Sequence, residues 1–356
     1  MGAGISLDSA RLCELLEALF AAHGCAQAEA HAVARHLVEA DLSGHPSHGA
    51  GLTPLYLANI RSGEVRVNRV LERVPIAGGF LLFEGGRGFG QSLGGQLVDQ
   101  VVALCGEHGV AVFGLRNSHH MGRIGDYGER FAVAGFASAL FVNTVSRPIV
   151  APHGGSEARM GTNPVCIAMP RRDAPPLVLD FATSAIAVGK CRVALENGQS
   201  IPPGAAIDAD GEPTTDPAVL YSSPQGALRA MGAHKGSGMN LLCELFAACI
   251  GGLTMCDANP ASGGVINNLV GMCFRASALP GAQAQIESAI RYFLATRPDR
   301  VDGPVRVPGS PERERHQHLL SDGVPMASAT WTAIADLARA AGIAEKQIAS
   351  VAKRDR

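Results

Sequence analysis

The apolar residues of this chain follow a helical period at both ends and a strand-like pattern between them. Leu12, Leu15, Leu16 and Leu19 recur at the spacing of one helix face, and Gly24 ends that run. Further helices are expected at residues 27–42, 53–61, 283–296 and 328–354. Because each such helix must bury its apolar face against a neighbour, the two helical ends are expected to pack together.

The middle of the chain alternates short β-like runs with helical ones. Strands are expected within residues 75–86, 110–117, 137–145, 164–170, 176–183 and 269–275. Helices are expected between them at residues 95–109, 124–136 and 236–252. The sequence therefore predicts an α/β domain over residues 76–282, and one discontinuous helical domain from residues 1–75 and 283–356.

Composition and charge limit the possible partners. The 356 residues are 47% hydrophobic with a net charge of −2, as in a globular enzyme. Lys and Arg are scattered, so neither nucleic acid nor a membrane surface is an expected partner. The nine cysteines include no CxxC pair, which is typical of reduced thiols in the cytoplasm. The N-terminus runs straight into an amphipathic helix, so no signal peptide is expected, and no apolar run approaches the roughly 18 residues of a membrane span.

The glycine-rich stretch GGRGFGQSLGG is the one candidate for a Rossmann dinucleotide site. After Gly86 and Gly88, the third position of that fingerprint is Gln91 rather than glycine. No acidic residue ends a next strand about 20 residues further on, where such a site contacts the ribose. The α/β middle is therefore not expected to be a Rossmann domain.

The segment GHPSHG places His45 and His48 three residues apart, at the end of a predicted helix that Gly44 can cap. It lacks the spacing of a zinc site, and His45 stands where the G-x-S-x-G elbow of a hydrolase needs glycine. No metal site is therefore expected. What remains is proton transfer by His48, with Ser47 fixing its tautomer or holding a substrate oxygen, while His45 is interpreted as a capping or surface residue.

Four further polar stretches stand at predicted helix starts, at a turn and at a strand end. NSHHMGRIGDY carries His119, His120 and Arg123 before a helix, where backbone amides attract anions. Thr162 and Asn163 precede a strand, and Asp180 ends one. HKGSGMN offers His234 and Lys235 at another helix start. The two helix starts fit a phosphate or carboxylate site, and all four stretches also fit ordinary turn and capping chemistry.

Together, seven ordered motifs resemble the malate/L-lactate dehydrogenase family, which lacks a Rossmann fold. They are DLSGHPSHG, NSHHMGRIG, APHGGSEARMGTNP, VLDFATSAIAVGK, IPPGAAIDADGEPTTDP, GAHKGSGM and VPGSPERER. The resemblance runs from about residue 6 to residue 350, and NSHHMGRIG looks most like the hydroxycarboxylate dehydrogenase branch. It implies a central α/β domain with a largely antiparallel sheet that binds NADH or NADPH, a helical domain from both chain ends, and a homodimer with its active site between domains.

The resemblance also assigns expected roles to single residues. His48 is expected to transfer the proton beside the nicotinamide with Ser47 as its neighbour, and His120 to lie at the substrate or nicotinamide. The other positions expected at the cofactor are Gly122, Arg123, Ile124, Thr162, Asn163, Val178, Leu179, Asp180, Phe181, Ala182, His234, Lys235, Asn267, Gly309, Ser310, Pro311 and Glu312. Many relatives read P-G-E-x-E where this chain has Pro308 to Glu312.

The expected reaction is reversible hydride transfer between NAD(P)H and C2 of a small 2-oxo or 2-hydroxy acid of the malate, lactate, 2-hydroxyglutarate or phenyllactate type, with His48 as general acid and base. Two alternatives stay open at the same site. One is a reductase of cyclic imine carboxylates, such as piperideine-2-carboxylate and pyrroline-2-carboxylate, or a dehydrogenase of the ureidoglycolate type. The other is a nucleotide-binding sensor that has lost activity.

Overall fold

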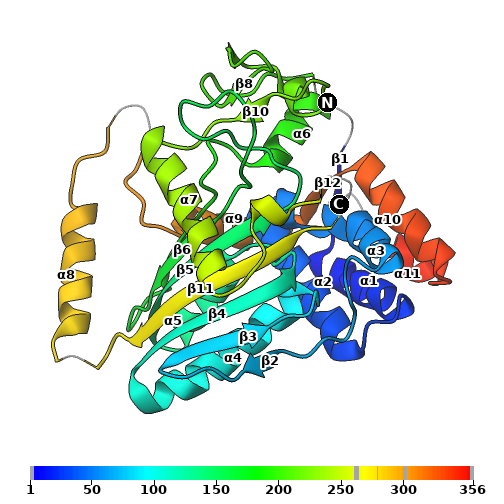
Figure 1. Ribbon diagram of the computed structural model, residues 1–356. Coiled ribbons are helices and arrows are strands. Elements are labelled where there is room, and N and C mark those ends of the chain that lie inside the picture. The colour runs from blue at the N-terminus through cyan, green and yellow to red at the C-terminus, as the bar shows by residue number, and fades with distance from the viewer. Residues whose placement is uncertain (1–3, 197, 260–263, 279, 300–302, 353–356) are drawn as a thin grey trace.

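A seven-stranded sheet forms the centre of the molecule. The computed structural model describes all residues except 1–3, 197, 260–263, 279, 300–302 and 353–356 (Figure 1). The sheet contains β2 (Glu72–Val74), β3 (Phe80–Glu84), β4 (Val110–His119), β5 (Phe136–Val145), β6 (Val165–Met169), β7 (Leu177–Phe181) and β11 (Ile266–Arg275). Its order is β2-β3-β4-β11-β5-β6-β7, and only β3 and β4 pair in parallel. The prediction of an α/β fold with a largely antiparallel sheet is confirmed.

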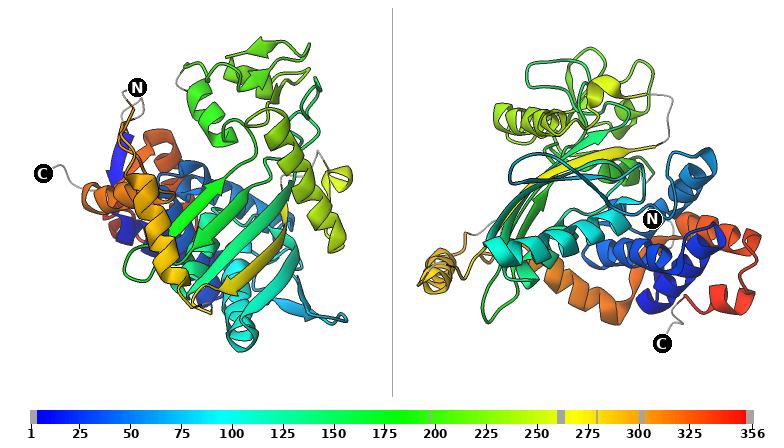
Figure 2. Two further views of the ribbon diagram at one scale, coloured as in Figure 1. Left: turned by 90° about the vertical axis from the view of Figure 1, so that its left-hand side faces the viewer. Right: turned by 60° about the horizontal axis from the view of Figure 1, so that its bottom comes forward.

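Strand β11 pairs with β4 on one side and β5 on the other. Residues alternate along it, so Cys273 is buried while its neighbours Met272 and Phe274 are exposed. The face that holds Cys273 is covered by α4 (Gly90–His108) and α5 (Gly125–Val133). The opposite face is covered in part by α7 (His234–Cys249), which packs over β5 (Figure 2).

The helical part of the molecule is built from both chain ends (Figure 2). Its elements are α1 (Ser9–Ala22), α2 (Gln27–Leu42), α3 (Thr53–Ser62), α10 (Ser328–Ala340) and α11 (Glu345–Ala349). Leu15, Leu16, Ile334 and Val351 share one buried core. Strand β1 (Gly4–Leu7) pairs antiparallel with β12 (Val324–Ala327) and ties the two ends together.

Several elements escape the sequence patterns. A small lobe contains α6 (Val188–Glu196), β8 (Ala206–Ile207), β9 (Pro213–Thr214) and β10 (Ala227–Leu228), and two-residue strands are too short to show a period (Figure 1). Helix α9 (Ser310–Asp322) occupies a stretch for which the sequence predicted no helix. The last predicted helix, over residues 328–354, is divided into α10 and α11 by Gly342 with φ of 80°, and residues 353–354 lie outside the described part.

Helix α8 (Ala282–Leu294) stands apart from the helical part and beside the sheet (Figure 1). Arg171 forms a bidentate ion pair with Glu287 and holds the helix there. Tyr292 is 86% exposed on α8. Within the described residues, none of the helices is both long and apolar enough to cross a membrane.

Replacing Leu16 by Ala is expected to lower the free energy of unfolding by roughly 2 to 5 kcal/mol, because the side chain is fully buried and a cavity would remain. Leu320→Ala is the matched control, because Leu320 is 51% exposed. Its effect is expected to stay within about 0.5 kcal/mol. Urea denaturation of both variants measures the difference, and equal effects would contradict the assigned core.

Candidate active site

His48 lies in a 3-10 turn, Pro46–His48, that follows α2. Gly44 ends the helix with φ of 83°, a left-handed conformation that suits glycine. The turn packs closely on the start of α6, because a Cβ atom at Gly189 would lie 2.3 Å from the Ser47 Cβ atom. His48 is therefore held between the helical part and the small lobe.

The His48 imidazole has two close neighbours. Its Nδ1 atom is 3.0 Å from the Ser47 hydroxyl, and its ring stacks on that of His120 with centroids 5.6 Å apart. Burial, followed by the nearby His45, His36 and Arg123, lowers the pKa of His48 to about 4. His48 is accordingly neutral near pH 7.

His120 follows the end of β4 and is bound from α3. The Tyr56 hydroxyl oxygen is 2.6 Å from His120 Nδ1, and the amide nitrogen of Gln91 donates to the same oxygen at 2.9 Å. Burial lowers the pKa of His120 well below its ordinary value, and the neighbouring His48 acts in the same direction. The structure thus brings together His48, Ser47 and His120, the three residues expected to do chemistry.

His119 is fully buried and serves the packing of this region. Its Nε2 atom is 3.0 Å from the side-chain amide nitrogen of Asn59, and its ring meets the edges of Tyr56 and Phe89. Tyr56 and Asn59 are three residues apart and share one face of α3, which reaches both histidines. Sequence analysis did not single out either of them, although their spacing of three residues on a predicted helix was the available signal.

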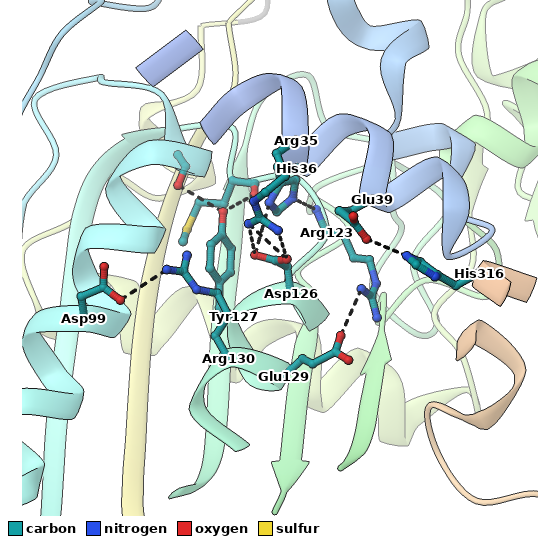
Figure 3. Close-up of polar contacts among 12 residues, drawn as sticks. Arg35, His36, Glu39, Asp99, Arg123, Asp126, Tyr127, Glu129, Arg130 and His316 are labelled. Carbon is teal, nitrogen blue, oxygen red and sulfur yellow. Dashed lines mark hydrogen bonds and ion pairs between the residues drawn. The ribbon is translucent and has the colours of Figure 1, made fainter. Parts of the chain in front are cut away.

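The loop of Gly122, Arg123 and Ile124 is held by His36 of α2. The Arg123 backbone N–H donates to His36 Nε2 at 2.9 Å, and a Cβ atom at Gly122 would lie 2.4 Å from that nitrogen. Figure 3 shows Arg35 and His36 reaching from α2 to Asp126 and the Arg123 loop. The Arg35 guanidinium and His36 hold the pKa of Asp126 far below its usual range, although burial opposes them. His36 is a site residue that sequence analysis missed.

Asp180 binds the start of α5. Its carboxylate accepts the Gly125 backbone N–H at 2.7 Å, and burial raises its pKa while Arg123 opposes that change. The helix start was expected to attract a bound anion, and here a carboxylate of the chain takes the Gly125 amide. Strand alternation turns Val178 toward the same side as Asp180, whereas Leu179 is 42% exposed on the other face.

A cavity of about 180 Å³ opens beside Arg123, between the start of β7 and the start of α9. Its walls include Arg123, Val178, Gly309, Glu312 and Arg313. The Arg123 side chain is only 7% exposed, and its Nε atom has no hydrogen-bond partner among the described residues. Gly309 has φ of 83°, and a Cβ atom there would lie 3.2 Å from the Val178 nitrogen.

Four more residues expected at the cofactor lie nearby. Ser310 and Pro311 form the first turn of α9 beside that cavity. Phe181 ends β7, and Ala182 follows it. His45 lies close to this group, with Nε2 3.8 Å from Glu312, and is half-buried. The interpretation of His45 as a surface residue is therefore incomplete, because it faces a carboxylate at the edge of the site.

Asn163 and Asn267 correct part of the sequence-based assignment. Asn163 is fully buried, and its side chain bonds the Thr144 backbone N–H, Asn240 and Glu244. The Asn267 side-chain oxygen accepts the Met121 backbone N–H at 2.8 Å. Both amides are occupied by protein groups, so they hold the strands and the loop after His120 instead of facing a ligand. The Thr162 carbonyl likewise accepts the Thr183 hydroxyl.

His234 and Lys235 are exposed at the start of α7. The His234 ring lies 6.1 Å from that of His153, which lines a second cavity of about 530 Å³. This cavity shares no lining residue with the one beside Arg123. The structure therefore brings His234 and Lys235 to a different place from Arg123 and Glu312.

The same arrangement of motifs and fold occurs in known proteins. The family model for malate/L-lactate dehydrogenase matches residues 7–335.

The chain belongs to the malate/L-lactate dehydrogenase family.

Among its relatives, hydroxycarboxylate dehydrogenase B of Escherichia coli (strain K12) is 38% identical over 98% of both chains. L-lactate dehydrogenase of Cupriavidus necator is 38% identical over 96% of this chain and 98% of its own. A solved structure of a putative malate/lactate dehydrogenase from E. coli superposes with a TM-score of 0.92, at 37% identity, over 97% of this chain and 98% of its own. These relatives support an oxidoreductase that acts on small hydroxy or oxo acids.

Proposed function

We propose that the protein interconverts 2-oxo and 2-hydroxy acids with NADH or NADPH, using His48 as general acid and base. The observation that carries this proposal is the pair of stacked imidazoles, His48 and His120, at the end of β4. Within this dehydrogenase family, such a pair of neighbouring imidazoles fits proton transfer coupled to hydride transfer. When bound, the nicotinamide supplies or accepts the hydride at C2.

His48 moves the proton. In the oxidation of a hydroxy acid, neutral His48 takes the hydroxyl proton on Nε2 while Nδ1–H donates to the Ser47 oxygen, 3.0 Å away. In the reduction of an oxo acid, the imidazolium returns that proton to the C2 oxygen.

The residues near Arg123 fit the phosphate and ribose portion of a dinucleotide. Arg123 offers a buried guanidinium whose Nε–H has no partner among the described residues, and Gly309, which carries no side chain, packs against the Val178 backbone. The nearby carboxylates of Glu312 and Asp180 can accept hydrogen bonds from the ribose hydroxyls. From these neighbours, we place the diphosphate at Arg123 and the nicotinamide toward His48.

Replacing His48 by Ala is expected to lower kcat by about 10²- to 10⁴-fold while the cofactor still binds, because only the proton transfer is lost. Absorbance of reduced nicotinamide measures the rate with a panel of 2-oxoglutarate, phenylpyruvate and piperideine-2-carboxylate, using both cofactors. His31→Ala is the control, because the His31 side chain is 59% exposed on α2. Turnover near wild type in His48→Ala would exclude His48 as the acid and base. A preference for the imine would make the protein a cyclic imine reductase.

The pH profile follows from the pKa of His48, which is lowered to about 4. Oxidation needs the neutral ring, so its kcat/KM is expected to be level above pH about 5 and to fall below pH about 4. Reduction needs the imidazolium, so its kcat/KM is expected to fall about tenfold for each pH unit above about 4. A level reduction profile from pH 5 to pH 8 would contradict this assignment.

His36→Leu is expected to raise the dissociation constant of the cofactor about fivefold, because the Arg123 N–H then loses its acceptor and the loop is released. Fluorescence titration with reduced cofactor measures the change. His36→Asn retains an acceptor and is expected to recover part of the affinity, and His31→Leu is the matched exposed control. Unchanged affinity in His36→Leu would contradict the role of this hydrogen bond.

We also propose a homodimer. On the sheet face opposite α4 and α5, an apolar row crosses five strands in register, and its exposed members are Val112, Met272, Ile167 and Leu179. Helix α7 extends the same face with exposed Leu241, Leu242, Leu245 and Phe246. An apolar surface of this extent is typical of an interface, and a second copy of the chain is the occupant that this family suggests.

Ile167→Asp is expected to shift the protein from dimer to monomer, because it places a charge in the centre of the apolar row. Light scattering after size-exclusion chromatography measures the mass. Val133→Asp is the control, because Val133 is 75% exposed on α5 at the other side of the sheet. A wild-type monomer, or an Ile167→Asp dimer of unchanged stability, would contradict this interface.

A reducing compartment such as the cytoplasm is proposed from the cysteines. All nine are free, and six of them are buried. Burial raises the pKa of Cys13 to about 11 and of Cys191 to about 11, which keeps these thiols protonated and unreactive.

A further inference from the structure

The protonation site of His120 decides what that ring can offer to a substrate beside His48. A neutral imidazole carries its proton on either Nδ1 or Nε2, and the nitrogen without it can only accept. The Tyr56 hydroxyl oxygen lies 2.6 Å from Nδ1, a short hydrogen bond. The donor in this bond therefore fixes the tautomer.

Gln91 determines the direction of that bond. Its side-chain amide nitrogen donates to the Tyr56 oxygen at 2.9 Å, and Gln91 is only 3% exposed. The buried Tyr56 O–H also needs an acceptor, and its oxygen has one other hydrogen-bonded neighbour among the described residues. That neighbour is His120 Nδ1, which must then be the acceptor.

The Tyr56 hydroxyl keeps its proton throughout the working range of pH. Tyr56 is 1% exposed, and burial raises the pKa of its phenol far above the ordinary value. His120 stays neutral as well, because burial, His48, His119 and His36 all lower its pKa. A neutral ring that accepts at Nδ1 carries its proton at Nε2.

We propose that Gln91 and Tyr56 form a relay that holds His120 as the neutral Nε2–H tautomer, so that His120 donates a fixed hydrogen bond to the C2 oxygen of the substrate. Tyr56 and Gln91 are positioning residues, and His120 is the residue that touches the substrate. The relay deepens the proposed function and rests on it for the identity of the oxygen.

Division of labour between the stacked rings follows from this relay. His48 exchanges a proton with the C2 oxygen, whereas His120 stays neutral and polarises the C2–O bond. A neutral imidazole N–H is a suitable donor to a developing alkoxide, because it adds no positive charge beside an imidazolium. The two rings stack with an interplanar angle of 19°, and the relay prevents both from carrying a proton on each nitrogen at once.

Tyr56→Phe is the kinetic test, because it removes one oxygen and keeps the ring that packs on Phe89 and His119. We expect kcat in oxo acid reduction to fall about 10- to 100-fold, since the preorganised donor is lost, with KM changed less than threefold. If Tyr56→Phe loses stability and its KM for substrate rises as much as its kcat falls, the role of Tyr56 is purely structural. That result would overturn the proposal.

Nitrogen-15 NMR of histidine-labelled protein without substrate is the direct test. The His120 signals, assigned by their loss in His120→Asn, are expected to show a protonated Nε2 and an unprotonated Nδ1 in the wild type. Tyr56→Phe is expected to lose this defined pattern. A wild-type proton on Nδ1 overturns the relay whatever the activity. An Nε2–H tautomer in a protein that reduces no oxo acid or imine would leave the relay standing and the proposed function wrong.

Gln91→Glu tests the direction of the relay. A carboxylate accepts from the Tyr56 hydroxyl, so the Tyr56 oxygen must then accept from His120, and the proton is expected to move to Nδ1 with a similar loss of kcat. Gln199→Glu is the control for the added charge, because Gln199 is exposed in the small lobe. An unchanged Nε2–H signal in folded Gln91→Glu would overturn the role of Gln91. The wild-type and Tyr56→Phe spectra decide the proposal even where Gln91→Glu does not fold.

Discussion

The packing of α2 and α3 against the end of β4 is the interaction on which the candidate site depends. Tyr56 binds His120, Asn59 binds His119, and His36 binds the Arg123 backbone. Each contact joins α2 or α3 to the last residue of β4 or to the loop that follows it. His119, His120 and the Arg123 loop therefore take their positions from one interface between the helical part and the sheet, next to the turn that carries His48.

Burial gives this interface its electrostatic character. His48, His119 and His120 all have lowered pKa values, with burial as the first cause in each case. Imidazoles in water become protonated at mildly acidic pH, but here burial makes protonation of any of the three rings energetically costly. The network accordingly works through hydrogen-bond direction and tautomer, and Asp126 with Arg35 is the strongly ionic pair at its edge.

The sequence predicted the parts of this site that depend on local pattern. The helix at 27–42, the cap at Gly44, the failed Rossmann fingerprint and the grouping of Ser47, His48 and His120 came from periodicity, turn chemistry and motif resemblance. The sequence could not show that the side-chain amides of Asn163 and Asn267 are hydrogen-bonded to protein groups. Met121, the partner of Asn267, is more than a hundred residues away, and Glu244, a partner of Asn163, lies in α7. Helix α9 was missed because its charged face resembles a solvated loop.

The pairing of β1 with β12 has a consequence for biosynthesis. Leu7 pairs with Val324 and forms a β-bridge with Ala352. Strand β1 therefore cannot complete its pairing until residues 324–352 have been synthesised. The sheet can form from internal segments as they leave the ribosome, whereas the helical core closes only after the far end of the chain has been made. The helices next to His48 and His120 are therefore expected to reach their final packing only after β12 and α10 have been made.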